Sequence, residues 1–404
     1  MAAFIRAQGL TPVLTNSLYH DVLEPRPETR TVTWPHSTDT LLTRVQSGAR
    51  LTPEQAIELA DHVPFHVLGQ LAHQRRCSRV GSEHGTFTID RNISFTNVCI
   101  VKCKFCAFCC NPGDARAFVM DLDEIVSRVQ EAKDLGATQI MLQGGLNPDL
   151  DLAWYEGLLR TIKTHCPDLW LHSLSPAEIL WLSQQAHLSL SETILRLQAA
   201  GLDSLPGGGA EILVDDIRNQ VSPAKLSTDE WFTVIRMAQT LGLSTTATMV
   251  YGFGETTAQR VEHLMRVRDL QDETGGFRAF IPWSFQSNKT QWSAPAQTGV
   301  DYLRVVALAR LVLDNVSHIQ SGWVTEGPDL AQLALRFGAD DMGGVLMEES
   351  VVSATGLDFG MSVQQMKRLI RGAGFVPAQR NTLYDMIRTF DQDPDVVSSE
   401  ASCS

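Results

Sequence analysis

Along the chain, hydrophobic residues recur in some segments with the two-residue period of strands and in the next with the 3.6-residue period of helices. This pattern predicts strands and helices in regular succession. Short apolar runs typical of strands lie near 86–96, 138–142, 169–174, 203–205, 244–251, 277–283, 318–324 and 342–347. Apolar residues at helical spacing fill the intervals, for example at 122–135, 228–241, 256–272 and 302–314. Eight such units predict an α/β fold whose parallel sheet closes as a (β/α)8 TIM-type barrel. The fourth and eighth strands have the weakest pattern, so an open six-stranded barrel with an added C-terminal part is the alternative.

A helical pattern precedes the first strand. Thr52, Pro53 and Glu54 supply an N-cap, a proline at the first helical position and an early acid. We therefore expect an N-terminal arm at 1–38, a helical extension at 39–85 and the barrel at 86–390. Residues 391–404 contain four acidic residues and no Lys or Arg, which predicts an acidic flexible tail.

Composition and charge exclude several classes of protein. The chain has 404 residues, 44% of them hydrophobic, and a formal net charge of −13. An acidic chain without a basic stripe argues against binding to nucleic acid or to an anionic membrane. No stretch approaches the length of a membrane span, and the N-terminus lacks the apolar core of a secretory signal. We therefore expect a cytoplasmic protein. The acidic net charge does not argue against an anionic small-molecule substrate, because binding one would need only one or two local cations.

Cysteine spacing gives the strongest chemical signal. Five of the eight cysteines lie between positions 99 and 110, and clustered cysteines favour a metal site over disulfides. Cys99, Cys103 and Cys106 have the spacing C-x3-C-x2-C, which suits three irons of a [4Fe–4S] cluster and leaves the fourth iron open. S-adenosylmethionine (SAM) can bind that iron, and an electron from the cluster then splits it into a 5′-deoxyadenosyl radical. A structural zinc site completed by Cys109 or Cys110, or a ferredoxin-like run, is the alternative.

Other candidate residues stand at the predicted carboxyl ends of strands, where barrel enzymes place their chemistry. Candidates for binding the cofactors are Phe105, Gln143, Gly144, Gly145, Glu211, Arg218 and Gly252. The two glycines after Gln143 would let the backbone approach the SAM amino group. Glu211 and Arg218, seven residues apart, would share one helix face and hold ribose hydroxyls and a carboxylate, although a surface ion pair is equally consistent. The turn at Gly252 would contact the adenine.

Two further strand ends suggest a substrate pocket. His172 is a candidate proton acceptor, with a structural histidine as the alternative. Residues alternate in side-chain direction along a strand, so Ser284 and Gln286 should share one face, and Trp283 and Phe285 the other. We expect the two polar residues to face the barrel interior, with Gln286 bonding the substrate, and the two aromatic residues to pack outward.

The sequence resembles a known family at these motifs. Asp90–Cys99 and Cys106–Phe108 are similar to a radical SAM subgroup from menaquinone and deazaflavin biosynthesis. Further matching stretches are 142–145, 172–179, 203–213, 246–249, 271–277 and 280–286, so the resemblance covers about residues 40–385. The stretch Trp283–Gln286 favours a cyclase of the menaquinone route. The other enzyme types of this subgroup remain as alternatives. One departure is Cys109–Cys110, where family members usually have Tyr-Arg.

The resemblance implies a radical SAM barrel, a [4Fe–4S] cluster and SAM, a nucleoside-derived carboxylate as substrate, and a one-electron donor whose identity the sequence does not reveal. The implied reaction is an intramolecular cyclisation. The radical removes hydrogen from C4′ of the substrate ribose, and the carbon radical adds to the substrate's own benzoate ring. Loss of an electron and a proton restores aromaticity. A non-catalytic iron–sulfur or zinc protein is the alternative function.

Overall fold

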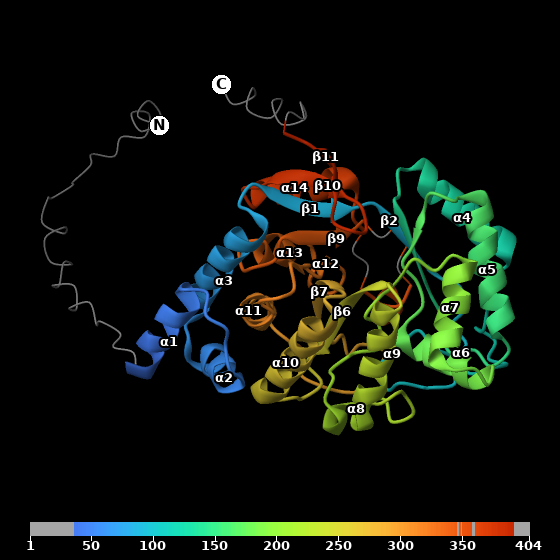
Figure 1. Ribbon diagram of the computed structural model, residues 1–404, viewed down its shortest axis with the longest axis horizontal. Coiled ribbons are helices and arrows are strands. Elements are labelled where there is room, and N and C mark those ends of the chain that lie inside the picture. Colours follow the sequence, from blue (N-terminus) through green and yellow to red (C-terminus); the bar gives the residue numbers. More distant parts are fainter. Residues whose placement is uncertain (1–35, 346, 349, 358–359, 392–404) are drawn as a thin grey trace, which may run out of the picture. The chain divides into compact units, whose positions relative to one another are not determined.

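The computed structural model describes residues 36–391, except 346, 349, 358 and 359 (Figure 1). The chain divides into two compact units, 1–40 and 41–404, and the second contains the barrel. Most of the predicted arm and all of the predicted acidic tail except Asp391 lie outside the described residues.

Helices precede the first strand, where the sequence predicts a helical extension. They are α1 (His36–Gln46), α2 (Pro53–His62) and α3 (Phe65–Val80). Thr52 and Gln55 cap the start of α2 reciprocally, since each side chain accepts a hydrogen bond from the other residue's backbone N–H. Helix α3 packs on α11 (Gly299–Val312), and α2 packs on α10 (Thr257–Thr274), so these helices support the outside of the barrel.

The barrel strands close into a parallel circuit. They are β1 (His84–Thr88), β2 (Asp90–Ser94), β3 (Gln139–Gln143), β4 (Trp170–Leu171), β5 (Ser204–Leu205), β6 (Ser244–Tyr251), β7 (Phe277–Ser284), β8 (His318–Ile319) and β9 (Asp341–Gly344). Strand β2 pairs with β3 and β3 with β4, while β5 to β8 form a second sheet. Single bridges from His172 to Ser204 and from Gln320 to Asp341 join the sheets, and β9 pairs with β1. Because β1 runs almost directly into β2, the described circuit has eight strand positions. The predicted (β/α)8 barrel is confirmed, and the open six-stranded alternative is wrong.

Helices surround the strands in the order that the sequence pattern predicts (Figure 1). They include α4 (Leu122–Asp134), α5 (Leu152–His165), α6 (Pro176–Gln185), α7 (Leu190–Ala200), α8 (Asp215–Val221), α9 (Thr228–Thr240), α12 (Trp323–Glu326) and α13 (Pro328–Ala334). Reciprocal capping starts several of them, as at Ser175 with Glu178 and at Ser227 with Glu230. Their apolar faces and the outward strand residues form one large hydrophobic core.

A C-terminal addition extends the sheet beyond the barrel. After the short 3-10 helix Ser353–Thr355 and α14 (Val363–Gly372), β10 (Val376–Arg380) pairs in parallel with β1, and β11 (Met386–Thr389) pairs antiparallel with β10. The barrel expected at 86–390 includes this segment, whereas β10 pairs with the edge of β1 opposite to β9, outside the circuit of eight strand positions. The addition brings Arg380 and Tyr384 against the barrel interior.

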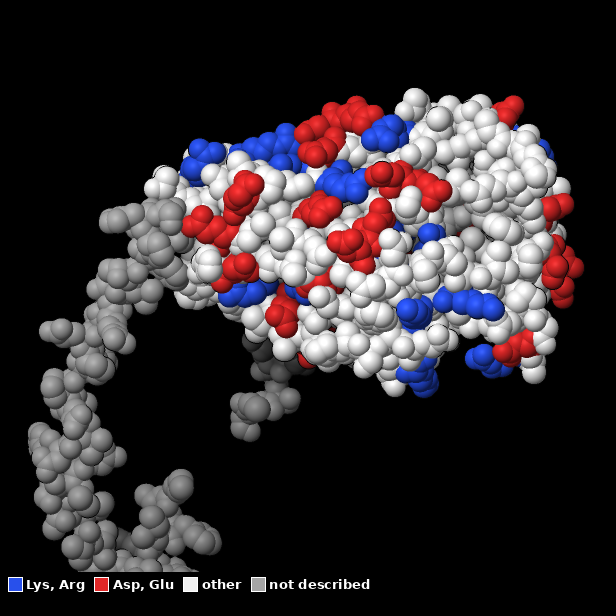
Figure 2. Space-filling model, turned by 90° about the horizontal axis from the view of Figure 1, so that it is seen from below, with Lys and Arg blue, Asp and Glu red and all other residues white. Residues whose placement is uncertain are grey.

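Surface charge and hydropathy complete the description. On the face in Figure 2, acidic and basic side chains are interspersed, and no basic stripe crosses that face. In the described part of the chain, no helix is both long and apolar enough to cross a membrane.

Candidate active site

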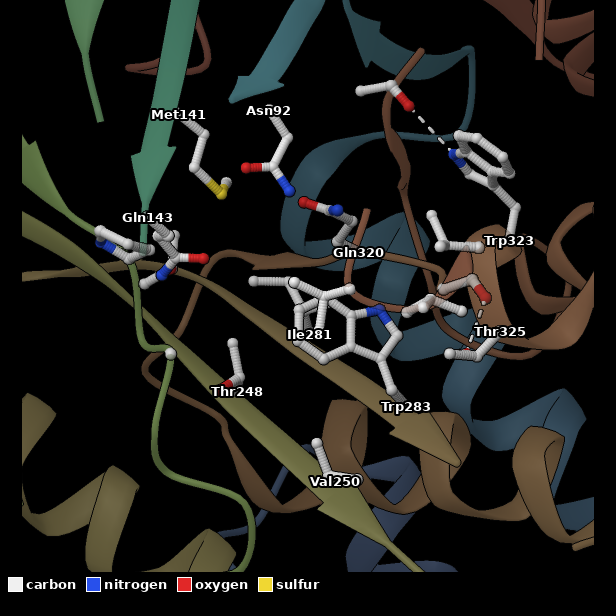
Figure 3. Close-up of a pocket in the computed structure, with 18 of the residues that line it drawn as sticks. Asn92, Met141, Gln143, Thr248, Val250, Ile281, Trp283, Gln320, Trp323 and Thr325 are labelled. Carbon is white, nitrogen blue, oxygen red and sulfur yellow. Dashed lines mark hydrogen bonds between the residues drawn. The ribbon is translucent and has the colours of Figure 1, made fainter. Parts of the chain in front are cut away.

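A cavity of about 340 Å³ occupies the interior of the barrel. Its wall is built from alternate residues of the strands, because every second side chain of a barrel strand points inward. Figure 3 shows Asn92, Met141, Gln143, Thr248, Val250, Ile281, Trp283 and Gln320 around this space. At the carboxyl ends of the strands the cavity reaches Phe105 and Cys106 of the cysteine loop, and at the opposite end it reaches Arg278 and Arg380. Its volume is that of a site for one small molecule.

Backbone hydrogen bonds fix the cysteine loop over the mouth of the barrel. The N–H of Cys99 donates to the carbonyl of Cys110 at 3.0 Å, which closes the loop on itself. The N–H of Lys104 donates to the carbonyl of Val221 at 2.9 Å, and the carbonyl of Lys104 accepts from Gln291 at 2.8 Å. The loop is therefore attached to α8 and to the segment after β7.

The donor set of this loop fits a [4Fe–4S] cluster. The thiols of Cys99, Cys103 and Cys106 lie close enough for their charges to interact, and burial raises the pKa of Cys103 to about 12. A hydrogen bond with Cys109 lowers the pKa of Cys106. A zinc ion needs several ligands directed at one point, and among the described residues no three His, Cys, Asp or Glu side chains are so placed. A cubane cluster instead takes each thiolate on a separate iron.

Gly144 and Gly145 pack against the start of the cysteine loop. A Cβ at Gly145 would lie 2.2 Å from the carbonyl oxygen of Val98 and 2.7 Å from Cβ of Cys99, and one at Gly144 would lie 2.6 Å from the Phe95 ring. Neither glycine lines the cavity, whereas Gln143 does. The missing side chains therefore serve to seat the cluster loop, and contact between either glycine and SAM stays a prediction.

Glu211 and Arg218 differ from the prediction. Glu211 precedes α8 and has a left-handed φ of 41°, so the two residues do not share a helix. Glu211 lines the cavity, is 5% exposed and accepts from Lys225 Nζ at 2.8 Å. Arg218 is 2% exposed and donates to the carbonyls of Ala210 and Leu226. Arg218 faces the backbone of this turn and lies 3.4 Å from Glu211, and its role in holding a carboxylate of SAM stays a prediction.

Phe105 and Gly252 lie on the same side of the cavity mouth. The Phe105 ring packs 5.5 Å from that of Phe253, and Lys225 Nζ lies 5.7 Å from the Phe105 centroid. Gly252 has φ of 100°, and the backbone N–H groups of Gly252 and Phe253 both donate to the carboxylate of Glu255 at 2.8 Å. These two donors are therefore occupied, and any contact of this turn with adenine would use other atoms.

The end of β7 corrects the predicted side-chain directions. Trp283 lines the cavity beside Ile281 (Figure 3), so the prediction that Trp283 packs outward is wrong. Ser284 and Gln286 line the cavity as predicted, and so does Phe285, because strict alternation stops where β7 ends at Ser284. The hydroxyl of Ser284 donates to Glu326 on α12 at 2.6 Å and accepts from Gln286 Nε2 at 2.9 Å.

His172 is buried in the cavity wall, with Nδ1 2.8 Å from the hydroxyl of Ser204. Burial, together with the charges of Arg278 and Arg380, holds the pKa of His172 well below its ordinary value. Such a histidine is neutral and a weak base, so this geometry favours a hydrogen-bonding role over proton acceptance.

Several wall residues were not among the sequence candidates. They are Asp90, Asn92, Thr246, Thr248, Arg278, Gln320, Arg380 and Tyr384. The detectable signal was polarity inside strands, since Thr246 and Thr248 alternate with apolar residues in β6, and Arg278 stands in an otherwise apolar strand.

A closed (β/α)8 barrel with a C-x3-C-x2-C loop over its mouth defines a radical SAM enzyme. Comparison with known proteins agrees, because residues 93–267 match the model of the radical SAM superfamily. Residues 274–393 match the CofH/MqnC C-terminal region.

Similar proteins cover almost the whole chain. It is 43% identical to a cyclic dehypoxanthine futalosine synthase of Halalkalibacterium halodurans, over 88% of this chain and 96% of that protein. It is 44% identical to one of Streptomyces coelicolor, over 88% and 90%. It is also 39% identical, over 83% and 96%, to a 5-amino-6-(D-ribitylamino)uracil–L-tyrosine 4-hydroxyphenyl transferase of Methanococcoides burtonii. The chain therefore belongs to the radical SAM superfamily, in the group that carries the CofH/MqnC C-terminal region. Enzymes of this superfamily bind a [4Fe–4S] cluster and SAM.

Solved structures show the same fold. The FeFe-hydrogenase maturase HydG from Carboxydothermus hydrogenoformans superimposes with a TM-score of 0.70 at 16% identity, over 86% of this chain and 80% of that one. Methylornithine synthase (PylB) gives a TM-score of 0.67 at 17% identity, over 84% and 97%.

Proposed function

We propose that this chain is a cyclic dehypoxanthine futalosine synthase, which joins two carbons of dehypoxanthine futalosine to form the cyclic product of the menaquinone route. The observation that carries the proposal is the 43–44% identity to two synthases of that name over 88% of the chain. The cavity beside the cysteine loop supports it, because an intramolecular reaction needs only one substrate to be held next to the bound SAM.

The end of the cavity next to the cysteine loop would bind the cluster and SAM. When bound, the cluster and SAM supply a 5′-deoxyadenosyl radical. Cys99, Cys103 and Cys106 would hold the cluster. Gln143, Glu211 and Phe105 line the cavity next to that loop and would hold SAM.

The middle of the cavity would position the substrate. Val250, Ile281 and Trp283 form an apolar wall that excludes water from the reacting carbon (Figure 3). Holding the ribose against the benzoate ring makes bond formation intramolecular. The reaction removes one hydrogen atom from C4′, joins C4′ to the ring, and then releases one electron and one proton from the ring. His172 and Gln286 line the same space, and we propose that both hydrogen-bond the substrate, His172 as a neutral group.

Partners and location complete the proposal. The reaction needs a separate one-electron donor to start it. We further propose a cytoplasmic location and no nucleic-acid partner, on the charge pattern of the sequence.

The test is a comparison of two substrates. The anaerobically reconstituted enzyme, with SAM and dithionite, should convert dehypoxanthine futalosine into a product lacking two hydrogens, detected by mass spectrometry. It should give no coupled product from 5-amino-6-(D-ribitylamino)uracil and tyrosine, the substrates named for the transferase relatives. The reverse pattern of products would overturn the proposal in favour of the transferase activity.

A further inference from the structure

Among the described residues, four Asp, Glu, Lys or Arg side chains line the cavity: Asp90, Glu211, Arg278 and Arg380. Arg380 and Asp341 form a bidentate ion pair, Nε–Oδ2 2.5 Å and Nη2–Oδ1 2.8 Å. Glu211 is balanced by Lys225 at 2.8 Å. Arg278 also lines the cavity, but within the described chain it has no acidic partner at ion-pair distance.

The contacts of Arg278 are with neutral groups. Its Nη1 donates to the hydroxyl of Ser244 at 3.3 Å, and its Nη2 lies 3.2 Å from Nδ1 of His172. Its Nε is buried and has no hydrogen-bond partner. A partly buried guanidinium without a counter-charge in contact is unfavourable, and its planar fork of donors matches a carboxylate.

The electrostatics of the cavity floor agree with this geometry. Burial lowers the pKa of Arg278 to about 10, so that the guanidinium is still charged at neutral pH. The pKa of His172 is lowered by burial and then by Arg278 and Arg380, so the histidine stays neutral and adds no charge to the floor. Asp341 and Asp90 compensate the charge of Arg380, whereas Arg278 has no acid in direct contact, and a carboxylate from outside the protein would supply one.

The position of Arg278 suits one end of an elongated substrate. Arg278 is the second residue of β7, and Trp283 stands near the other end of that strand. Five residues of strand span on the order of 16 Å. The cysteine loop closes the cavity at the Trp283 end, where Phe105 and Cys106 line it. A molecule whose carboxylate meets Arg278 can therefore present its far end to the cluster and SAM.

We infer that Arg278 binds the carboxylate of the substrate at the floor of the cavity, with His172 beside it as a neutral hydrogen-bonding partner. The identity of that carboxylate, the benzoate group of dehypoxanthine futalosine, rests on the proposed function. The anion site itself does not depend on the proposed function, because it follows from the guanidinium of Arg278, which has no acidic partner in contact. With the carboxylate held at the floor, the ribose points toward the cysteine loop, which is the orientation that hydrogen removal at C4′ requires.

The first experiment tests the anion site without the reaction. Binding of benzoate and of its neutral isostere benzamide is measured by calorimetry on the cluster-loaded enzyme with SAM. A charge-assisted bidentate contact predicts that benzoate binds about tenfold or more tightly than benzamide. Arg278→Gln should abolish this preference. Arg236→Gln, the same change on the surface of α9 where Arg236 is 43% exposed, should preserve it.

The second experiment uses the substrate. Arg278→Gln should raise KM for dehypoxanthine futalosine about tenfold or more, while cluster absorbance and substrate-independent formation of 5′-deoxyadenosine stay at wild-type levels. The carboxamide of the substrate should show the same high KM with the wild-type enzyme, a comparison that needs no variant to fold. Equal affinity of the wild type for benzoate and benzamide, or retention of the preference in Arg278→Gln, would overturn the inference. A wild type that prefers benzoate through Arg278 but leaves dehypoxanthine futalosine unchanged would support the anion site and refute the proposed function.

Discussion

The ammonium of Lys225 lies 2.8 Å from Oε1 of Glu211, behind the cysteine loop at the mouth of the cavity. Burial opposes the charge of Lys225, but Glu211 and Cys103 outweigh it and raise the pKa of the ammonium. Side-chain exposure is 14% for Lys225 and 6% for Glu211, so the pair is shielded from water.

Removing this cation should therefore destabilise the fold. Lys225→Met is expected to lower the free energy of unfolding by about 3 kcal/mol, because it leaves Glu211 with only the more distant Arg218 at 3.4 Å. The matched control is Lys163→Met, whose partner Asp203 is 26% exposed and whose loss should cost about 1 kcal/mol or less. Urea denaturation measures both, and equal losses would contradict the account.

Gly145 should be required for cluster binding. Gly145→Ala would bring a methyl group within 2.2 Å of the Val98 carbonyl oxygen and displace Cys99, so iron content per chain should fall sharply. Gly157→Ala is the control, because Gly157 lies within α5 and an added Cβ meets nothing within 4 Å. That substitution should keep full iron content and stabilise the helix by about 0.5–1 kcal/mol. Full iron content in Gly145→Ala would show that the loop does not need this close contact.

The three cluster cysteines should differ from their two neighbours. Loss of the intact cluster is expected in each of the variants Cys99→Ala, Cys103→Ala and Cys106→Ala. The absorbance of the cluster and the cleavage of SAM are the two measurements. Cys109→Ala and Cys110→Ala should keep both, because three thiolates suffice for a cubane with one open iron. A cluster lost with Cys109 but kept without Cys99 would reverse the assignment.

Glu178 should make stability depend on pH. Its carboxylate is 1% exposed and accepts hydrogen bonds from Gly144 N at 3.1 Å and from Ser175 N at 2.6 Å. Burial raises its pKa to about 7, against the lowering effect of these bonds. The unfolded chain, with the ordinary pKa of 4.5, then releases the proton first. Stability should fall by about 1.4 kcal/mol per pH unit as pH rises from 4.5 to 7.

The comparison variant is Glu178→Gln, which does not titrate. The difference in unfolding free energy between wild type and variant, measured by denaturation from pH 4.5 to 7.5, should change with that slope. A difference that is constant across this range would show that Glu178 is ionised throughout in the folded protein.

The sequence was sufficient for the barrel because strand patterning is local. The runs at 244–251 and 277–283 reappear as β6 and β7 within one residue. It was insufficient where a long-range contact decides the outcome. The polarity of the residues predicts that Trp283 faces outward. In the structure the hydroxyl of Ser284 donates a hydrogen bond to Glu326 of α12, and the indole of Trp283 lies in the apolar wall of the cavity.

Arg278 shows a second limit of sequence patterns. Trp283 and Ile281 point inward, and regular alternation from them would turn Arg278 outward. The pairing of β6 with β7 is irregular here, since Thr245 pairs with Phe277 but Thr246 pairs with Ala279. This bulge turns Arg278 into the cavity, and the sequence shows the charge within an apolar run but not the bulge that redirects it.

The most direct test of the account follows a single hydrogen atom. Dehypoxanthine futalosine carrying deuterium at ribose C4′ is incubated with the reconstituted enzyme, SAM and dithionite, and the 5′-deoxyadenosine is analysed by mass spectrometry. One deuterium should enter 5′-deoxyadenosine as the cyclic product forms, because the cavity presents the ribose to the cluster end. Cyclic product formed with 5′-deoxyadenosine free of deuterium, or no product from this substrate at all, would contradict it.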